Sequence, residues 1–192
     1  QYLVRNTDLA MERIMDVRLN IATKDESFYF FSNGVVSVKK DEIILIAYEE
    51  FSGFVFEDQI IKHEIEILED LEENMFNEFL SCVSNKNPER YHQLTSAIGY
   101  LVHSYKDPSN TKAIILVDEV LDFAGEANGG TGKTLISKAV SKIIPSLQKD
   151  GKSIVKSGNR FFYQDVNIGH RVMVIDDVNP NFNFEDFYSV VT

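Results

Sequence analysis

The chain of 192 residues is long enough for one medium domain, or one domain with an accessory subdomain, and can bury a core without disulfide staples. Its hydrophobic fraction of 44% and charged fraction of 26% exclude disordered, collagen-like and coiled-coil classes. The net charge of −11 repels polyanions, so these residues form no broad electrostatic surface for nucleic acid.

The apolar runs IILIA and AIILV are each the length of a strand, too short to cross a membrane. The N-terminus has scattered charges and no apolar stretch typical of a signal peptide. A single cysteine, Cys82, fits a reducing compartment. We therefore expect a soluble, cytoplasmic protein without a membrane partner. Because the chain starts at Gln1 and stops at Thr192 in mid-pattern, we expect it to be a piece of a longer polypeptide.

The first part of the chain, residues 1–62, is predicted to hold a short helix at 8–20 and a small β meander. The run FYFFSNGVVSVKKDEIILIAYEE alternates β-rich stretches with turn signals at Asn33-Gly34 and at KKDE. A helical subdomain is expected over 63–110. Apolar residues at helical spacing predict one helix between Ile65 and Val83, with a solvated acidic face, and a second that Asn87 caps and that ends near Lys106.

The last part, residues 111–192, alternates expected strands and helices. AIILV at 113–117 predicts a buried parallel strand, and a glycine-rich loop then leads into an amphipathic helix that Pro145 interrupts. Short strands are expected around 153–155 and 161–163. VMVIDD at 172–177 predicts a second buried strand that ends in two carboxylates.

The glycine-rich loop matches the Walker A pattern, with alanine at the first position in place of glycine. Glycines allow successive backbone N–H groups to surround phosphates, and the start of the following helix adds the positive end of its dipole. Lys133 is expected to reach the β- and γ-phosphates, and Thr134 to bind Mg²⁺. The expected ATP-binding residues are Ala127, Asn128, Gly129, Gly130, Thr131, Gly132, Lys133 and Thr134.

Asp176 and Asp177 stand at the end of the VMVIDD strand, where a Walker B acid belongs. Carboxylate oxygen suits Mg²⁺, so we assign Asp176 to the metal. Asp177 is assigned, with Lys133, a catalytic role, because it can orient or deprotonate the attacking water. The alternatives are a chance match in a solvent loop and a polar turn after a core strand. Asp118 and Glu119 follow the AIILV strand and are left out of the predicted site, because carboxylates at strand ends usually meet only water.

With these motifs the chain resembles the superfamily 3 helicases, which are fused to primases in poxviruses, phages and integrative plasmids. FFSNGVVSV and IGYLVHSYKDPSNTKAIILVDE are similar to the segments that precede the ATPase core in that family, and NGGTGKT and VMVIDDV to its Walker motifs. The resemblance implies an α/β fold with a three-layer, AAA+-like P-loop NTPase core, incomplete at its C-terminus. It also implies ATP and Mg²⁺ as cofactors, a hexameric ring, and single-stranded DNA as a partner of a replicative helicase.

Two features of the chain depart from the family pattern. Residues 118–126 separate the expected strand from Ala127, and the family's sensor asparagine, basic hairpin and arginine finger normally follow Walker B, beyond this chain. We therefore expect poor DNA binding and weak or absent hydrolysis by these residues alone. The alternatives are another P-loop motor, such as an initiator or packaging ATPase, a small-molecule kinase, and a non-catalytic nucleotide-binding assembly module.

Overall fold

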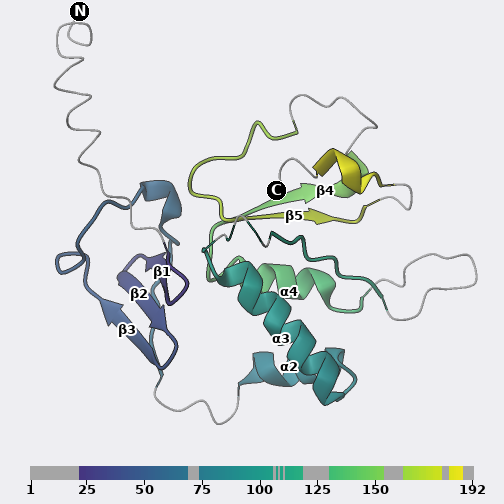
Figure 1. The fold of residues 1–192 in the computed structure, drawn as a ribbon, viewed down its shortest axis with the longest axis horizontal. Coiled ribbons are helices and arrows are strands. Elements are labelled where there is room, and N and C mark those ends of the chain that lie inside the picture. The colour runs from purple at the N-terminus through teal and green to yellow at the C-terminus, as the bar shows by residue number, and fades with distance from the viewer. Residues whose placement is uncertain are drawn as a thin grey trace, which may run out of the picture.

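The computed structural model describes residues 22–68, 74–105, 107, 109, 111–118, 130–153, 162–178 and 182–187. Within these ranges the chain forms an antiparallel sheet of three strands, a parallel sheet of two strands, and the helices α2, α3 and α4 (Figure 1). The mixed α/β class expected from the sequence is confirmed. The helix expected at 8–20 lies outside the described residues.

The antiparallel sheet is the predicted meander, with β1 (Glu26–Phe31), β2 (Gly34–Lys39) and β3 (Glu42–Ile46) paired in chain order. The turn at Asn33 sets the register of the first hairpin, in which Phe31 faces Gly34. The open edge of β1 is partly covered by the residues after 60, because the backbone N–H of Ile61 donates to the carbonyl of Phe30 at 2.9 Å. The meander prediction is therefore confirmed.

The first helix, α2 (Met75–Val83), begins later than the sequence predicted. Residues 65–68 have no regular secondary structure. The side-chain amide of Asn33 accepts the N–H of Ile65 and donates to its carbonyl, so these backbone groups hold the meander instead of a helical turn. Asn74 then caps α2 by accepting the N–H of Phe76 at 2.8 Å.

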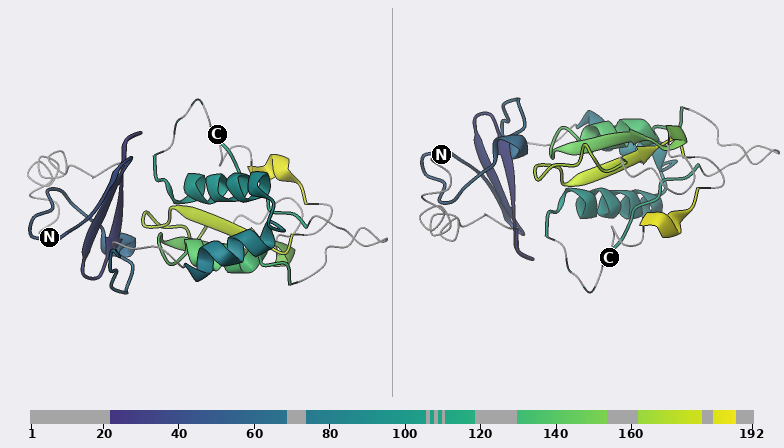
Figure 2. Two further views of the ribbon diagram at one scale, coloured as in Figure 1. Left: turned by 90° about the horizontal axis from the view of Figure 1, so that it is seen from below. Right: turned by 90° about the horizontal axis from the view of Figure 1, so that it is seen from above.

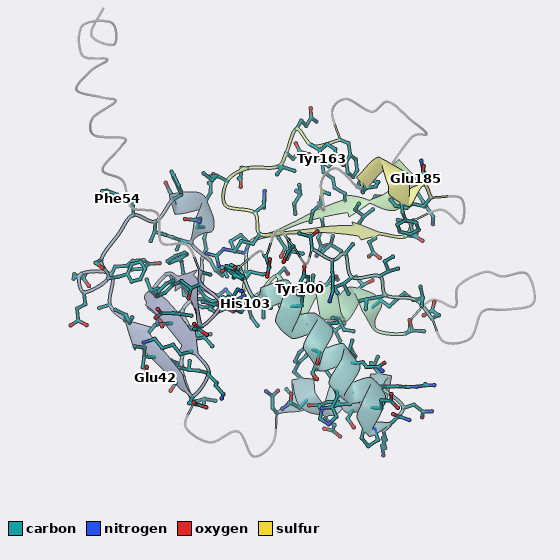
Figure 3. The ribbon with its side chains drawn as sticks, in the orientation of Figure 1. Glu42, Phe54, Tyr100, His103, Tyr163 and Glu185 are labelled. Carbon is teal, nitrogen blue, oxygen red and sulfur yellow. The ribbon has the colours of Figure 1, made fainter. Side chains whose placement is uncertain are left out.

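The second helix, α3 (Pro88–Val102), starts where it was predicted. Asn87 accepts the N–H of Arg90 at 3.1 Å, and Pro88 occupies the first turn. The helix ends at Val102, with His103 as its C-cap, before the expected Lys106. Figure 3 marks Tyr100 and His103 near this end, where the Tyr100 hydroxyl accepts the N–H of Lys112 at 2.9 Å.

The expected buried strand at 113–117 is wrong. Residues 111–118 have no regular secondary structure, and Ile115 and Val117 are 58% and 77% exposed. An apolar run becomes a strand only when a neighbouring strand takes up its backbone hydrogen bonds, and no strand in the described part of the chain pairs with this segment.

The next helix, α4 (Lys133–Val140), begins at the predicted residue and is followed by a turn and Pro145. Ile136, Val140 and Ile144 are buried, whereas Leu135 and Ile143 are exposed. In Figure 1 this helix lies below the parallel sheet.

The parallel sheet contains β4 (Ser146–Asp150) and β5 (Val172–Asp176), paired from Ser146 opposite Val172 to Asp150 opposite Asp176. The strand at 172–176 was predicted, although it is only partly buried. The strand at 146–150 was not predicted, because SLQKD has a single apolar residue. Of the other expected strands, residues 162–163 lie in a turn and 154–161 lie outside the described residues.

One hydrophobic core connects the antiparallel sheet to the rest of the molecule. Tyr29, Phe31 and Val36 pack with Val140 and Ile144 in a single buried cluster. In Figure 2 the antiparallel sheet lies to one side of the unit formed by the helices and the parallel sheet. The proposed division at 62 and 110 stays a prediction, but the core crosses both of these positions, because partly buried Ile98 and Val102 also join it. None of the described helices combines the length and apolarity needed to cross a bilayer.

Candidate functional site

The glycine-rich loop leads directly into α4, and its last residues have the backbone geometry that its glycines permit. Gly130 and Gly132 have φ angles of +83° and +92°, a region that L side chains rarely adopt. Lys133 and Thr134 occupy the first two positions of α4, whose N–H groups have no acceptor within the helix. These amides and the positive end of the helix dipole provide an anion-binding position.

The loop is also closely packed from one side by α2. A Cβ atom added at Gly132 would lie 3.0 Å from the ring of Phe79 and 3.3 Å from the Val83 side chain. Glycine is therefore required here both by the backbone angle and by the contact with α2. Ala127, Asn128 and Gly129, the other predicted members of the loop, lie outside the described residues.

Thr134 and Asp176 lie next to each other, as the assignment of both to Mg²⁺ requires. The Thr134 hydroxyl donates a hydrogen bond to Asp176 Oδ2 at 3.2 Å, across 42 positions of sequence. One residue comes from the first turn of α4 and the other from the C-terminal end of β5. Parallel pairing of β4 with β5 fixes this strand end and places Asp150 beside Asp176.

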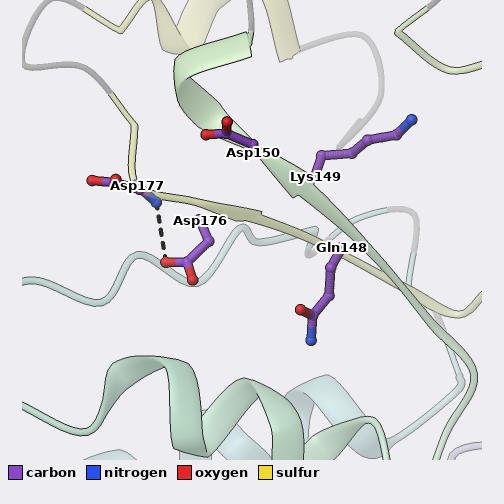
Figure 4. Close-up of a pocket in the computed structure, with 5 residues that line it drawn as sticks. All are labelled: Gln148, Lys149, Asp150, Asp176 and Asp177. Atoms are coloured by element: carbon purple, nitrogen blue, oxygen red, sulfur yellow. Dashed lines mark hydrogen bonds between the residues drawn. The ribbon is translucent and has the colours of Figure 1, made fainter. Parts of the chain in front are cut away.

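The two consecutive aspartates at the C-terminal end of β5 face different surroundings. Asp150, Asp176 and Asp177 line a shallow open hollow together with Gln148 and Lys149, and the carboxylates of Asp176 and Asp177 point in different directions (Figure 4). Asp177 has a φ angle of +56°, and its carboxylate forms an ion pair with Lys152. The hydrogen bond that Lys152 donates to Asp177 within this ion pair raises the pKa of Lys152 above its usual value.

Lys133 is paired with Asp118, a residue that is not part of the predicted site. Its ammonium donates to Asp118 Oδ1, and Thr131 donates its hydroxyl to the same oxygen. Lys133 also donates to Thr131 Oγ1 at 2.9 Å. The Asp118 side chain is only 2% exposed, and its other oxygen, Oδ2, has no hydrogen-bond partner in the described part of the chain. The hydrogen bonds from Lys133 and then Thr131 hold the pKa of Asp118 below its usual range.

The sequence predicts that Asp118 meets only water, because it follows an apolar run with the composition of a strand. The structure places it against Lys133 instead. The signal in the sequence is an acidic residue between an apolar run and the glycine-rich loop, and this signal does not identify which cation the acid will meet.

Comparisons with protein-family models, with characterised proteins and with solved structures found no match.

Proposed function

We propose that this chain binds the triphosphate of ATP together with Mg²⁺ and is the phosphate-binding part of an ATP-hydrolysing enzyme with a P-loop NTPase core. The observation that carries the proposal is the contact between Thr134 and Asp176. A chance Walker A match in a solvent loop would have no reason to meet the acid at the end of a strand 42 positions away. A hydrogen bond joins the two predicted Mg²⁺ ligands directly.

The residues present fit a magnesium ion that is shared with a nucleotide. A hydroxyl and a carboxylate provide hard oxygen ligands, and Mg²⁺ in nucleotide sites is commonly held by one or two carboxylates, substrate phosphates and water. No cluster of three or more His, Cys, Asp or Glu that could hold a metal occurs within the described ranges. The described residues therefore do not enclose Mg²⁺ with protein ligands alone. Thr134 and Asp176 would hold the Mg²⁺, which when bound would neutralise negative charge on the phosphates.

The other residues would bind and orient the phosphates. The N–H groups at the start of α4 would donate to phosphate oxygens, and the Lys133 ammonium would add a charge-assisted hydrogen bond. Asp177 would orient water for attack, which requires its carboxylate to leave Lys152. That requirement favours a second candidate, a nucleotide-binding assembly module without turnover.

We further propose that the enzyme is a replicative DNA helicase, and here the support is the resemblance of the motifs to superfamily 3. The net charge of −11 makes these residues a poor DNA-binding surface, so DNA contacts and ring formation would depend on other parts of an assembly. An initiator or packaging ATPase would share every site residue. Stimulation of hydrolysis by single-stranded DNA would favour the helicase over these motors.

The proposal is tested by measuring ATP binding to the chain by isothermal titration calorimetry. Replacement of Lys133 by alanine removes a charge-assisted hydrogen bond and should weaken ATP binding by roughly 10–100-fold. Lys138→Ala is the matched control, because it removes the same charge from the exposed side of the same helix. Equal affinities of the two variants would contradict the proposed phosphate site.

The magnesium assignment is tested in the same titration with and without the metal. Asp176→Asn keeps the size of the side chain but removes its charge, so the gain in ATP affinity on adding Mg²⁺ should fall by about tenfold or more. Thr134→Ser retains the hydroxyl and should keep most of that gain. A gain in Asp176→Asn equal to that of the wild type would remove Asp176 from the metal site.

A further inference from the structure

The Lys133 ammonium, which the proposed function directs at phosphate, has an internal anion as its partner. Asp118 is the last described residue of the segment 111–118, which has no regular secondary structure, and it meets the first residue of α4. Its Oδ1 accepts hydrogen bonds from both Lys133 and Thr131. Two side chains of the P-loop therefore donate to one carboxylate oxygen.

The burial of Asp118 distinguishes this contact from a surface ion pair. Its side chain is 2% exposed, against 32% for Lys133, and Oδ2 is buried without a hydrogen-bond partner in the described part of the chain. A buried carboxylate with one unsatisfied oxygen is costly, and its stabilisation here comes from the ammonium and the Thr131 hydroxyl. In the Lys149–Asp165 pair, by contrast, the carboxylate is 54% exposed and lacks this constraint.

We propose that Asp118 is an affinity-setting residue of the nucleotide site, which holds Lys133 when no nucleotide is bound and competes with the triphosphate for its ammonium. This inference rests on the proposed function. A carboxylate and a phosphate are both anionic oxygen acceptors, so both attract the same donors. Binding of a triphosphate draws Lys133 from Asp118, and the buried carboxylate then loses part of its stabilisation.

The opposite role predicts the opposite sign. If Asp118 oriented Lys133 toward phosphate, its removal would leave the long lysine side chain without a fixed direction and weaken binding. If Asp118 competes, its neutralisation removes a rival acceptor and a nearby negative charge, and binding becomes tighter. The sign of the change in affinity therefore separates the two roles.

The test is the dissociation constant of inorganic triphosphate and of MgATP for wild type, Asp118→Asn and Asp165→Asn, by titration calorimetry at constant ionic strength. Asp165→Asn is the matched control, because it neutralises the carboxylate of another lysine–aspartate pair. Asp118→Asn should bind both ligands about tenfold more tightly, the effect of one charge-assisted hydrogen bond, whereas Asp165→Asn should bind them as the wild type does.

Weaker or unchanged binding by Asp118→Asn, with normal binding by the wild type, would overturn the competing role and leave the proposed function intact. No binding of either ligand by the wild type would overturn both. Thermal melts establish whether each variant is folded. If Asp118→Asn is not, Asp118→Ser provides the neutral variant, and the same tighter binding is required of it.

Discussion

Asp177 is the residue whose predicted role differs most from its contacts. Its φ angle of +56° lies in the left-handed region, which costs a non-glycine residue on the order of 1 kcal/mol, although aspartate tolerates it better than most. Its N–H donates to Asp176 Oδ1 at 3.0 Å, while its carboxylate pairs with Lys152. The left-handed turn thus separates the carboxylates of two consecutive aspartates.

This separation leads to a prediction for catalysis. If Asp177 orients the attacking water, Asp177→Asn should lower the rate of phosphate release by roughly 10²–10⁴-fold while ATP binding changes little. Lys152→Ala is the control, because it breaks the ion pair but keeps the carboxylate, and it should turn over at least as fast as the wild type. Phosphate release is measured with single-stranded DNA present. ATP binding by the wild type without any turnover would favour the assembly module.

At the scale of elements, the junction of α2 with the glycine-rich loop gives a prediction for stability. Gly132→Ala places a Cβ at φ +92° and 3.0 Å from the Phe79 ring, so the free energy of unfolding should fall by roughly 1–3 kcal/mol. Gly99→Ala in α3 is the control, because nothing lies within 4 Å of its added Cβ. There, alanine should stabilise the helix by up to about 1 kcal/mol. Urea unfolding measures both changes, and equal effects of the two variants would contradict the packing argument.

The elements that could be predicted from sequence are those with local signals. The turn at Asn33-Gly34 fixes the first hairpin, and Asn87 with Pro88 starts α3, because turn and cap preferences act within a few residues. The start of α4 also followed from a short motif, so each of these predictions depended on neighbouring residues. The expected nearness of Thr134 and Asp176, 42 positions apart, depended instead on combining two motifs.

The predictions that failed depended on distant partners. AIILV has the composition of a strand but no described strand beside it, whereas SLQKD has a poor strand composition and pairs with β5 along its whole length. The late start of α2 has the same origin, because Asn33 takes the backbone groups of Ile65. Asp118 was left out for this reason too, since only the fold brings it to Lys133.

At the scale of the whole molecule, the antiparallel sheet contacts the part of the chain that carries the proposed nucleotide site. The guanidinium of Arg171, the residue before β5, donates to the carbonyl of Phe28 at 2.8 Å and lies 5.5 Å from the centre of the Phe30 ring. A Cβ at Gly169 would meet the backbone of Asp58 at 2.2 Å, so the chain entering β5 passes very close to the meander. These contacts connect the strand that carries Asp176 to β1.

Tyr29 lies in the shared core, and its ionisation gives a pH test of this connection. Burial raises the pKa of Tyr29 above its usual value of 10.0, although Ser27 and Arg171 lower it in part. In the unfolded chain Tyr29 ionises near the usual value. The stability that neutral Tyr29 contributes is therefore fully present below about pH 10 and falls as the pH rises toward the pKa of the folded protein. Tyr29→Phe should therefore lose less stability than the wild type above pH 10, with equal slopes between pH 7 and 9.

The same titration shows whether the two parts unfold together. The difference in tyrosine absorbance between the wild type and Tyr29→Phe can follow the antiparallel sheet, because it isolates Tyr29 from the other tyrosines. A fluorophore on Cys82, the single cysteine and an exposed residue of α2, can follow the helices beside the glycine-rich loop. Tyr29, Phe31, Val140 and Ile144 form one buried cluster. Loss of packing around Tyr29 therefore exposes the C-terminal end of α4, which carries Val140. Both probes should therefore give one transition with one midpoint in alkaline unfolding. Melting of the sheet while the Cys82 signal stays native would show that the two parts are stable independently, and that the core contacts do not couple them.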